Sequence, residues 1–435
     1  MSHSPSPVTL KDVPSIVTAE PFRLAKGLQI LAVVMIAVGV YGFAREAFGG
    51  GDPRHAWSAF QVNFIYWFCI AIASTGFTAV FHICNAQWAR PLKRLFEAGS
   101  AFLIYCPLIL LFLFAFRAYD SIFSWAGSEI PGKSSWLQPG AVYVRDIIAM
   151  IVLILISKRL VHWSIRRDIG AIRSGLTGLS KEQTQRWHEP QYDCYVQDWG
   201  SDAHAELRKI DHLMGRFSPP MIMVYALVMT LIAFDQVMSV DPHWYSTMFG
   251  AFVFMGAVYL AVAWTSMSVA FVRTHPLFRA KVERRTLHDL GKLLFGFGIF
   301  WAYLFWSQYL PIWYSNMPEE TGYMILRLRE EPWHQVGWMV LGLCFFIPFL
   351  LGLSRDVKQI PQLLFCTGMI AACGMWVQHY LLFVPTLFPD HIPYGFTDVS
   401  ITLAFFGAYL LSVTKFLERV PLMPFGDLYV YKPSH

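Results

Sequence analysis

Charged residues make up only 14% of this 435-residue chain, against roughly 25% in an ordinary soluble domain. Hydrophobic residues make up 55%, and the mean hydropathy is +0.44. Apolar runs long enough to cross a bilayer recur along nearly the whole sequence. We therefore expect an integral membrane protein with no soluble domain of its own.

The ligands of common redox cofactors are also scarce. The seven cysteines are scattered, without a C-x-x-C pair, which excludes a cysteine-bound iron–sulfur cluster or zinc site. His379 is the only histidine deep inside an apolar run, with His82 and His334 near the ends of runs. Because haem b needs histidine pairs on facing helices, we expect none here. Hydrolase and P-loop motifs are absent, so the chain is expected to bind no cofactor by itself, and its status as an enzyme stays open.

Ten apolar segments are long enough, at 1.5 Å per residue, to cross a hydrocarbon core of about 30 Å, or nearly so. They are residues 24–44, 60–83, 99–116, 141–157, 221–240, 247–272, 290–313, 333–353, 360–385 and 399–418. The sequence therefore predicts an all-α integral membrane protein with about ten transmembrane helices.

Lysine and arginine predict the orientation of these spans. Of 34 such residues, about 27 lie in the two tails and in loops after even-numbered spans, against about seven elsewhere. This asymmetry predicts a multi-pass protein of the bacterial inner membrane with both termini in the cytoplasm. The longest cytoplasmic loop, 158–217, is expected to form a short amphipathic excursion that anchors at lipid or contacts a partner. Since the basic residues sort by membrane side, we expect no nucleic-acid partner.

Two basic segments indicate an internal repeat. Trp88–Arg94 (WARPLKR) follows span two, and Arg273–Arg279 (RTHPLFR) follows span six. An offset of four spans preserves orientation, so we expect a parallel repeat about an axis along the membrane normal. The predicted parts are a cytoplasmic tail 1–23, a flanking helix 24–44, a four-helix bundle 60–240 including loop 158–217, a second bundle 247–385, a flanking helix 399–418 and a cytoplasmic tail 419–435.

Asp235 is the clearest carboxylate inside an apolar span and is followed by Gln236. A buried charge costs several kcal/mol unless it is paired, hydrated or protonated. We therefore hypothesise a role in a proton path; the alternatives are a helix cap or a side chain that reaches the outer interface. Gln378 and His379 fall at the matching place in span nine. An imidazole can relay protons near neutral pH, although a buried histidine is often only a structural hydrogen-bonding group.

Span seven adds further candidates for the proton path. Near its outer end are four polar residues that could line water or join helices: Tyr303, Ser307, Gln308 and Tyr309. At its cytoplasmic start are three residues that, with His82, could form an inner mouth or an ordinary interfacial cluster: His288, Asp289 and Lys292.

The outer loops supply the candidates for the outer face, which are Asp241, His243, Glu319 and Glu320. Pro242 predicts that Asp241 caps the start of span six. Loop 314–332, including Arg327, is expected to be a docking surface for periplasmic subunits. Four further residues near this interface are expected to pair with one another: Arg117, Asp120, Arg145 and Asp146.

Two longer strings carry a family resemblance: FDQVMSVDPHWYST at Phe234–Thr247 and FWSQYLPIWYSNMPEET at Phe305–Thr321. With these strings, the ten spans and the closing Val420–Leu422 segment, the chain resembles the ActF-type membrane subunits of alternative complex III. These are also described as quinone-binding subunit 2 of quinol:cytochrome c oxidoreductase, within the NrfD/PsrC-like superfamily. The resemblance covers most of the chain and implies two four-helix bundles with a flanking helix at each end.

The resemblance implies a subunit of a respiratory or photosynthetic quinol:electron-acceptor oxidoreductase, contributing a proton path and assembly rather than redox centres. Haems c and iron–sulfur clusters are then expected in partners: an iron–sulfur subunit, a multihaem cytochrome c and a paralogous NrfD-like subunit. Quinol or menaquinol is a candidate ligand. The alternatives are a quinol-binding subunit proper, a proton-coupled secondary transporter built from the repeat, or a scaffold without a proton path.

Overall fold

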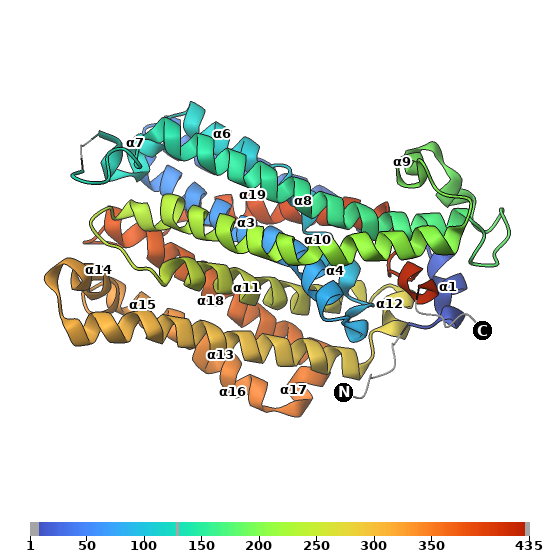
Figure 1. Cartoon of the computed structure of the whole chain (residues 1–435). Helices are drawn as coiled ribbons and strands as arrows, with labels where there is room; N and C mark the ends of the chain where they lie inside the picture. Colours follow the sequence, from blue (N-terminus) through green and yellow to red (C-terminus); the bar gives the residue numbers. More distant parts are fainter. Residues whose placement is uncertain (1–7, 128–129, 431–435) are drawn as a thin grey trace.

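The computed structural model describes residues 8–127 and 130–430. In this part of the chain there is no β-strand, and ten helices are long and apolar enough to cross a membrane. They run side by side along one long axis (Figure 1). The protein is a multi-pass all-α membrane protein, as the sequence predicts.

The ten spans coincide with the ten predicted segments, although most helices are longer. In chain order they are α2 (Lys26–Phe48), α3 (Pro53–Ile83), α4 to α6 (Lys93–Ala115), α8 (Pro139–Arg173), α10 with the turns η6 and η7 (Ala203–Val240), α11 (Phe249–Val272), α13 (Arg284–Ser315), α15 to α16 (Trp333–Leu353), α18 (Pro361–Leu387) and α19 (Phe396–Glu418).

Short helices cover the two ends of the bundle. They include η1 (Leu10–Asp12), α1 (Val13–Val17), η2 (Gln87–Ala89), α7 (Tyr119–Ile122), η3 (Ser124–Gly127), η4 (Gln185–His188), η5 (Pro190–Tyr192), α9 (Asp193–Val196), α12 (Pro276–Lys281), α14 (Pro318–Leu328), α17 (Arg355–Gln359) and η9 (Gly426–Tyr429).

The spans form the two predicted four-helix bundles. In the first, α3, α4 to α6, α8 and α10 pack in sequence, and α10 closes back on α3. In the second, α11, α13, α15 to α16 and α18 pack in the same order, and α18 closes back on α11. The bundles meet where α3 and α10 contact α11, and the flanking helices α2 and α19 pack together beside α3. The two groups of helices thus pack in the same order at an offset of four helices, as a parallel repeat would.

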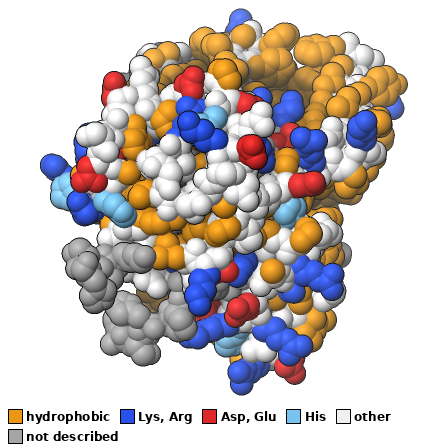
Figure 2. All heavy atoms as spheres, turned by 90° about the vertical axis from the view of Figure 1, so that its right-hand side faces the viewer, with side chains coloured by type: hydrophobic (Ala, Val, Ile, Leu, Met, Phe, Trp, Pro, Cys, Tyr) orange, Lys and Arg blue, Asp and Glu red, His pale blue; other side chains and the backbone are white. Residues whose placement is uncertain are grey.

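The molecule has two distinct ends. Helix α1, helix α12 and the C-terminal turn η9 lie at one end, which we call the terminal end, whereas α7 and α14 lie at the far end (Figure 1). Figure 2 shows the terminal end, where lysine and arginine side chains are spread among acidic ones.

The predicted excursion over 158–217 is largely a continuation of two membrane helices. Helix α8 continues to Arg173 and α10 begins at Ala203. Beyond the apolar segments the two helices are joined by ion pairs, Arg166 to Glu206 at 3.1 Å and Arg167 to Asp211 at 3.0 Å. Because these charges find partners within the protein, the polar stretch stays helical beyond the bilayer.

Candidate functional site

Asp235 lies in the π-helical turn η6 (Ala233–Val237), at the far end of α10. A π-turn is rare, and such turns occur frequently at functional sites. The side chains of Asp235 and Gln236 are both buried, with relative exposures of 1% and 0%. The turn thus places two neighbouring polar side chains inside the first bundle.

The charge of Asp235 is offset by an arginine from α8. Arg145 donates from Nε to Oδ2 of Asp235 at 2.5 Å, and Trp136 donates from Nε1 to Oδ1 at 2.9 Å. The Arg145 guanidinium also lies 3.9 Å from the centre of the Trp136 ring and donates to the Trp136 carbonyl at 2.9 Å. Since the side chain of Arg145 is 22% exposed, this ion pair reaches the surface at the far end.

A second carboxylate lies beside this pair. Asp146 is fully buried on α8 and lies close enough to Asp235 to interact with it electrostatically. Gln236 donates from Nε2 to Oδ2 of Asp146 at 2.6 Å, and its Oε1 accepts from Gln61 of α3 at 2.9 Å. We call these residues the far-end cluster: Gln61, Arg145, Asp146, Asp235 and Gln236. It contains two carboxylates and one guanidinium.

The predicted pairing near the outer interface is right for one pair and wrong for the other. Arg117 pairs with Asp120 at 2.7 Å on the surface. Arg145 instead pairs with Asp235, because successive helical residues point in different directions and Arg145 faces α10. Gln61 was not a candidate, since a single glutamine in an apolar run gives no signal in the sequence.

Gln378 and His379 form a separate polar arrangement in the second bundle. Gln378 accepts a hydrogen bond from Trp301 Nε1 at 3.0 Å. His379 Nδ1 lies 2.7 Å from the Met375 carbonyl, and its ring meets Tyr66 edge-on. A cavity of about 10 Å³ lies against His379 and Val237, about the size of one water molecule. No hydrogen bond between described residues joins His379 directly to Asp235.

The polar residues of span seven point in different directions. Tyr303 is 59% exposed, and Ser307, one turn later on the same side, is only partly buried, as is Tyr309. Gln308 alone is buried, and it accepts from the Ser246 hydroxyl at 3.3 Å. The Tyr303–Ser307 face is therefore on the outside of the bundle.

The turn after η6 does not start span six. Asp241 accepts a hydrogen bond from the His243 backbone N–H at 3.3 Å, and α11 begins only at Phe249. The predicted capping of span six by Asp241 is therefore wrong. The physical reason is Trp244, which is buried and stacks on Tyr323 of α14 at 3.9 Å, so the chain runs into the protein before the helix starts.

Helix α14 presents its acidic first turn, with Glu319 exposed and Glu320 partly buried. Arg327, predicted to belong to a docking surface, is instead buried and donates from Nε to the Leu381 carbonyl at 2.9 Å. Pro385 lacks the N–H that would bond that carbonyl within α18. Arg327 thus satisfies a backbone group that the proline leaves free.

A buried ionic network at the terminal end is the main feature that sequence reasoning missed. Arg94 of α4 donates to both Glu97 and Asp168, and all three are fully buried. Asp168 also accepts from the backbone N–H groups of Phe425 and Gly426, at 3.1 and 2.7 Å. In the sequence these charges lie in segments that are typical of a basic loop and a tail. They come together only because the C-terminal segment, at Phe425 and Gly426, returns to α8.

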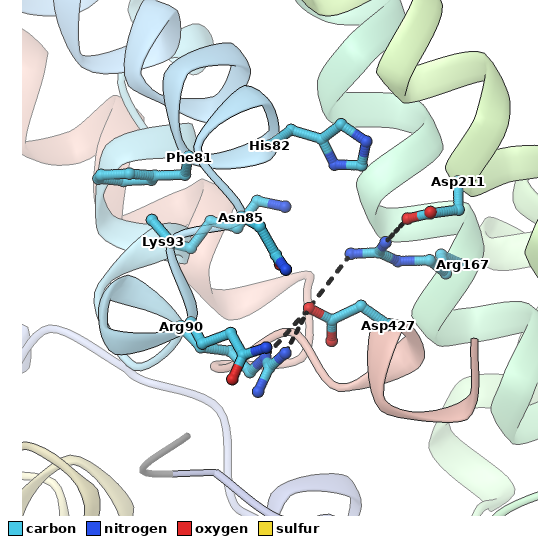
Figure 3. Close-up of a pocket in the computed structure, with 10 residues that line it drawn as sticks. Phe81, His82, Asn85, Arg90, Lys93, Arg167, Asp211 and Asp427 are labelled. Atoms are coloured by element: carbon cyan, nitrogen blue, oxygen red, sulfur yellow. Dashed lines mark hydrogen bonds and ion pairs between the residues drawn. The ribbon is translucent and has the colours of Figure 1, made fainter. Parts of the chain in front are cut away.

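This network continues into a small polar pocket (Figure 3). Asp427 Oδ2 lies 2.9 Å from Arg90 and 3.9 Å from Arg167, and Arg167 also bonds Asp211. His82 and Lys93 line the same pocket, whose volume is about 30 Å³. Burial raises the pKa of Asp427, but the nearby Arg167 and Arg90 guanidinium groups outweigh it and hold this pKa below its ordinary value of 3.8.

The predicted inner mouth is only partly assembled. His82 lies in this pocket, whereas the described residues that line it do not include His288, Asp289 or Lys292. Lys292 pairs with Asp289 at 2.6 Å near the surface. These three residues form an interfacial cluster of their own on α13.

A third buried group joins the flanking helices to the first bundle. His55 Nε2 lies 2.9 Å from Asp398 of α19, and its Nδ1 lies 3.5 Å from Glu46 of α2. Hydropathy did not indicate this group, because its three members lie at the starts or ends of separate helices.

The far-end and terminal-end groups are separated by an apolar section. Helix α10 carries no charged residue from Phe217 to Phe234, a length of about 27 Å. This is close to the thickness of a hydrocarbon core. The charged groups therefore lie near the two membrane surfaces, with the far-end cluster enclosed inside the first bundle.

No protein-family model and no curated protein matches this chain. The case for its function therefore rests on the arrangement of these buried polar groups and on the resemblance of the two sequence strings.

Proposed function

We propose that the chain is an integral membrane subunit of a quinol:electron-acceptor oxidoreductase of the alternative complex III type. In this proposal it contributes a proton-exchange site and an assembly surface, and the redox centres belong to partners. The observation that carries the proposal is the far-end cluster, in which the guanidinium of Arg145 pairs with Asp235 and the neighbouring buried carboxylate of Asp146 is bonded by Gln236. The ActF-like string around Asp235 supports the same assignment.

The chemistry follows from the charge count. One arginine offsets one carboxylate, so a second carboxylate in the same enclosed site is stable only if it holds a proton or gains another partner. Gln236 donates to Asp146 and accepts from Gln61, which fixes the position of the Asp146 carboxylate. The partly exposed Arg145 and Trp136 connect the cluster to the far surface. The site is therefore suited to bind and release one proton on that side.

The apolar section of α10 limits this proposal to proton exchange at the far end. In the positive-inside assignment that end faces the periplasm and the terminal end faces the cytoplasm of a bacterial cell. The terminal-end network balances four cations against four carboxylates, which favours a structural role: Arg90, Lys93, Arg94 and Arg167 against Glu97, Asp168, Asp211 and Asp427.

An assembly surface is supported by α13 and α14 at the far end. Trp306, Trp313 and Tyr314 are more than half exposed, and the acidic first turn of α14 begins at Pro318, shortly after them. An aromatic band suits the membrane interface or another membrane subunit, and the acidic turn suits a basic patch on a periplasmic subunit. We propose that the haem- and cluster-bearing partners dock there.

One observation favours the quinol-binding alternative. A mostly apolar cavity in the second bundle is lined by aromatic side chains, including Phe252, Trp301 and Phe305, together with the polar Gln308 and Gln378. Aromatic walls with a few polar groups are typical of small-molecule sites. Its volume is only about 50 Å³, however, room for one or two waters, so a quinol ring would require these side chains to move.

The transporter alternative gains no support from the repeat. A site at the repeat interface is expected to have helix breaks at corresponding positions. Among the described residues, π-turns lie in span five, at Ala233–Val237, and in span eight, at Gly342–Phe346. These spans do not correspond under an offset of four.

The proposal is tested with the purified complex in proteoliposomes, comparing quinol oxidation with pH change outside the vesicles. Asp235→Asn keeps the size and much of the hydrogen bonding of the side chain but removes its titration. We expect assembly to be normal and the number of protons released per electron to fall. Asp120→Asn, at an exposed ion pair, is the matched control. Unchanged proton stoichiometry in the assembled Asp235→Asn complex would contradict the proton role, and purification of a stable chain with no redox partner would contradict the subunit role.

A further inference from the structure

A groove on the outer surface of the protein, independent of the proposed function, has the form of a lipid site. It lies between α2, the third span (α4 to α6) and α19 and has a volume of about 380 Å³. Its walls are mostly aliphatic and aromatic, with Ile36, Ile109, Phe405 and Leu411 among them. We call it the α2–α19 groove.

The length of this groove along α19 matches the thickness of one leaflet of a bilayer. Along α19 it extends from Ala404 to Lys415, which is about 16 Å at 1.5 Å per residue. Half of a hydrocarbon core of about 30 Å is about 15 Å. Ala404 and Ala408 lie one turn apart and contribute only methyl groups to the groove, which leaves room for a chain of methylenes.

The charged residue among the described lining residues of the groove lies at its terminal end. Lys415 is exposed there and forms no ion pair with any described residue. Ala32 of α2 contacts Gly407 of α19, and Gly39 contacts Ala404, so the two helices are antiparallel. This register brings Lys26, at the start of α2, to within about one turn of the level of Lys415.

The charge of the groove selects among possible occupants. None of the described lining residues is acidic, so a negative group lying in the groove at Lys415 would meet a cation and no acidic lining residue. A partner's transmembrane helix is about 10 Å wide and crosses both leaflets. The groove is as long as one leaflet is thick, and it has a cation, Lys415, at its terminal end. These two features fit an acyl chain that carries a phosphate.

We propose that the α2–α19 groove binds one anionic glycerophospholipid from the leaflet at the terminal end. An acyl chain lies along Ala404 and Ala408, and the phosphate is held by Lys415 with Lys26 nearby. A basic residue near a membrane surface attracts anionic lipid by about 1 kcal/mol, which corresponds to about fivefold in occupancy.

The test uses the full-length chain, with any subunits that remain bound, exchanged into mixed micelles containing phosphatidylglycerol or phosphatidylcholine. Native mass spectrometry counts the lipid molecules retained by each chain. Lys415→Gln removes the cation, and Ala408→Trp fills the groove. The matched controls are Lys158→Gln, which removes another exposed lysine at the terminal end, and Ala37→Trp, which places a bulky side chain on the exposed surface of α2.

We expect the unaltered chain to retain one phosphatidylglycerol in preference to phosphatidylcholine. Lys415→Gln should lower the occupancy of phosphatidylglycerol about fivefold, Ala408→Trp should abolish retention of either lipid, and both controls should leave it unchanged. Equal retention of the two lipids by the unaltered chain, or normal phosphatidylglycerol retention by Lys415→Gln, would overturn the proposal. Because Lys415→Gln is a surface change, its result remains decisive if Ala408→Trp impairs folding.

Discussion

The two four-helix bundles have the same packing order but bury different groups. The first encloses charged side chains near both of its ends, such as Arg94, Asp168, Asp146 and Asp235. In the described chain, no lysine, arginine, aspartate or glutamate from the spans of the second bundle is buried, and its interior contains uncharged polar pairs such as Trp301 and Gln378. Helix order therefore depends on apolar packing, whereas buried charge depends on local partners that only one bundle supplies.

The largest expected effect follows from breaking the terminal-end network of the first bundle. Arg94→Met removes the guanidinium shared by Glu97 and Asp168 and leaves two buried carboxylates without it. Removing one partner of a buried ionic group costs about 3–5 kcal/mol. We expect a large loss of folded protein, measured as the yield of monodisperse chain and its melting temperature in detergent. Arg117→Met, at an exposed pair, should change stability by less than about 1 kcal/mol; equal losses for both variants would contradict the structural role of Arg94.

A smaller effect is expected at the far-end cluster, because Arg145 is partly exposed. Arg145→Gln leaves Asp235 with the Trp136 N–H and no cation. We expect a loss of about 2–3 kcal/mol, at the lower end of the range for charge-assisted bonds and buried pairs. The double variant Arg145→Gln/Asp235→Asn should recover part of this loss, since the uncompensated charge is also removed. Thermal unfolding in detergent measures both, and strictly additive losses would exclude the pairing.

The C-terminal segment provides a prediction about pH. Asp427 is outside the spans, and its pKa is held below 3.8 by Arg167 and Arg90. A lowered carboxyl pKa contributes stability above the ordinary value and loses it as the pH falls through the folded-state value. The stability difference between the native chain and Asp427→Asn should therefore be constant from about pH 8 to pH 5 and shrink below about pH 4. A difference that vanishes near neutral pH, in melting temperatures measured across this range, would contradict the assignment.

The smallest effect is expected in the interior of the second bundle. Trp301→Phe keeps the aromatic ring in the core but removes the donor to Gln378. Hydrogen bonds between membrane helices contribute about 0.6 kcal/mol on average. We expect a loss of this order, measured by unfolding in detergent. A loss as large as that of Arg145→Gln would remove the contrast drawn between the two bundles.

Much of the fold was predictable from the sequence, because a segment that crosses lipid must be apolar and must form its backbone hydrogen bonds internally, as a helix does. The ten spans follow from apolar length, and the repeat from two basic segments at the ends of spans two and six. The extension of α8 and α10 was not predictable in this way, since it depends on Arg166 and Arg167 meeting partners on another helix.

The site was predictable only in part. Asp235 is conspicuous, because a carboxylate in an apolar run needs a reason. The partners of Asp235 were harder to predict from the sequence, because the π-turn redirects the chain locally and Gln61 is distant in sequence. The terminal-end network depends on Asp427 and Gly426, which return to α8 from the C-terminal segment. A Cβ on Gly426 would lie 2.9 Å from the Arg167 backbone, so this contact depends on a glycine whose role appears only in three dimensions.

Infrared difference spectroscopy of the purified protein, recorded as the pH is raised, can detect an exchangeable proton on the far-end carboxylates. We expect a protonated-carboxyl signal that disappears on titration in the native chain, is absent or altered in Asp235→Asn and in Asp146→Asn, and is unchanged in Asp120→Asn. The same carboxyl signal in all four proteins would show that neither Asp235 nor Asp146 holds this proton.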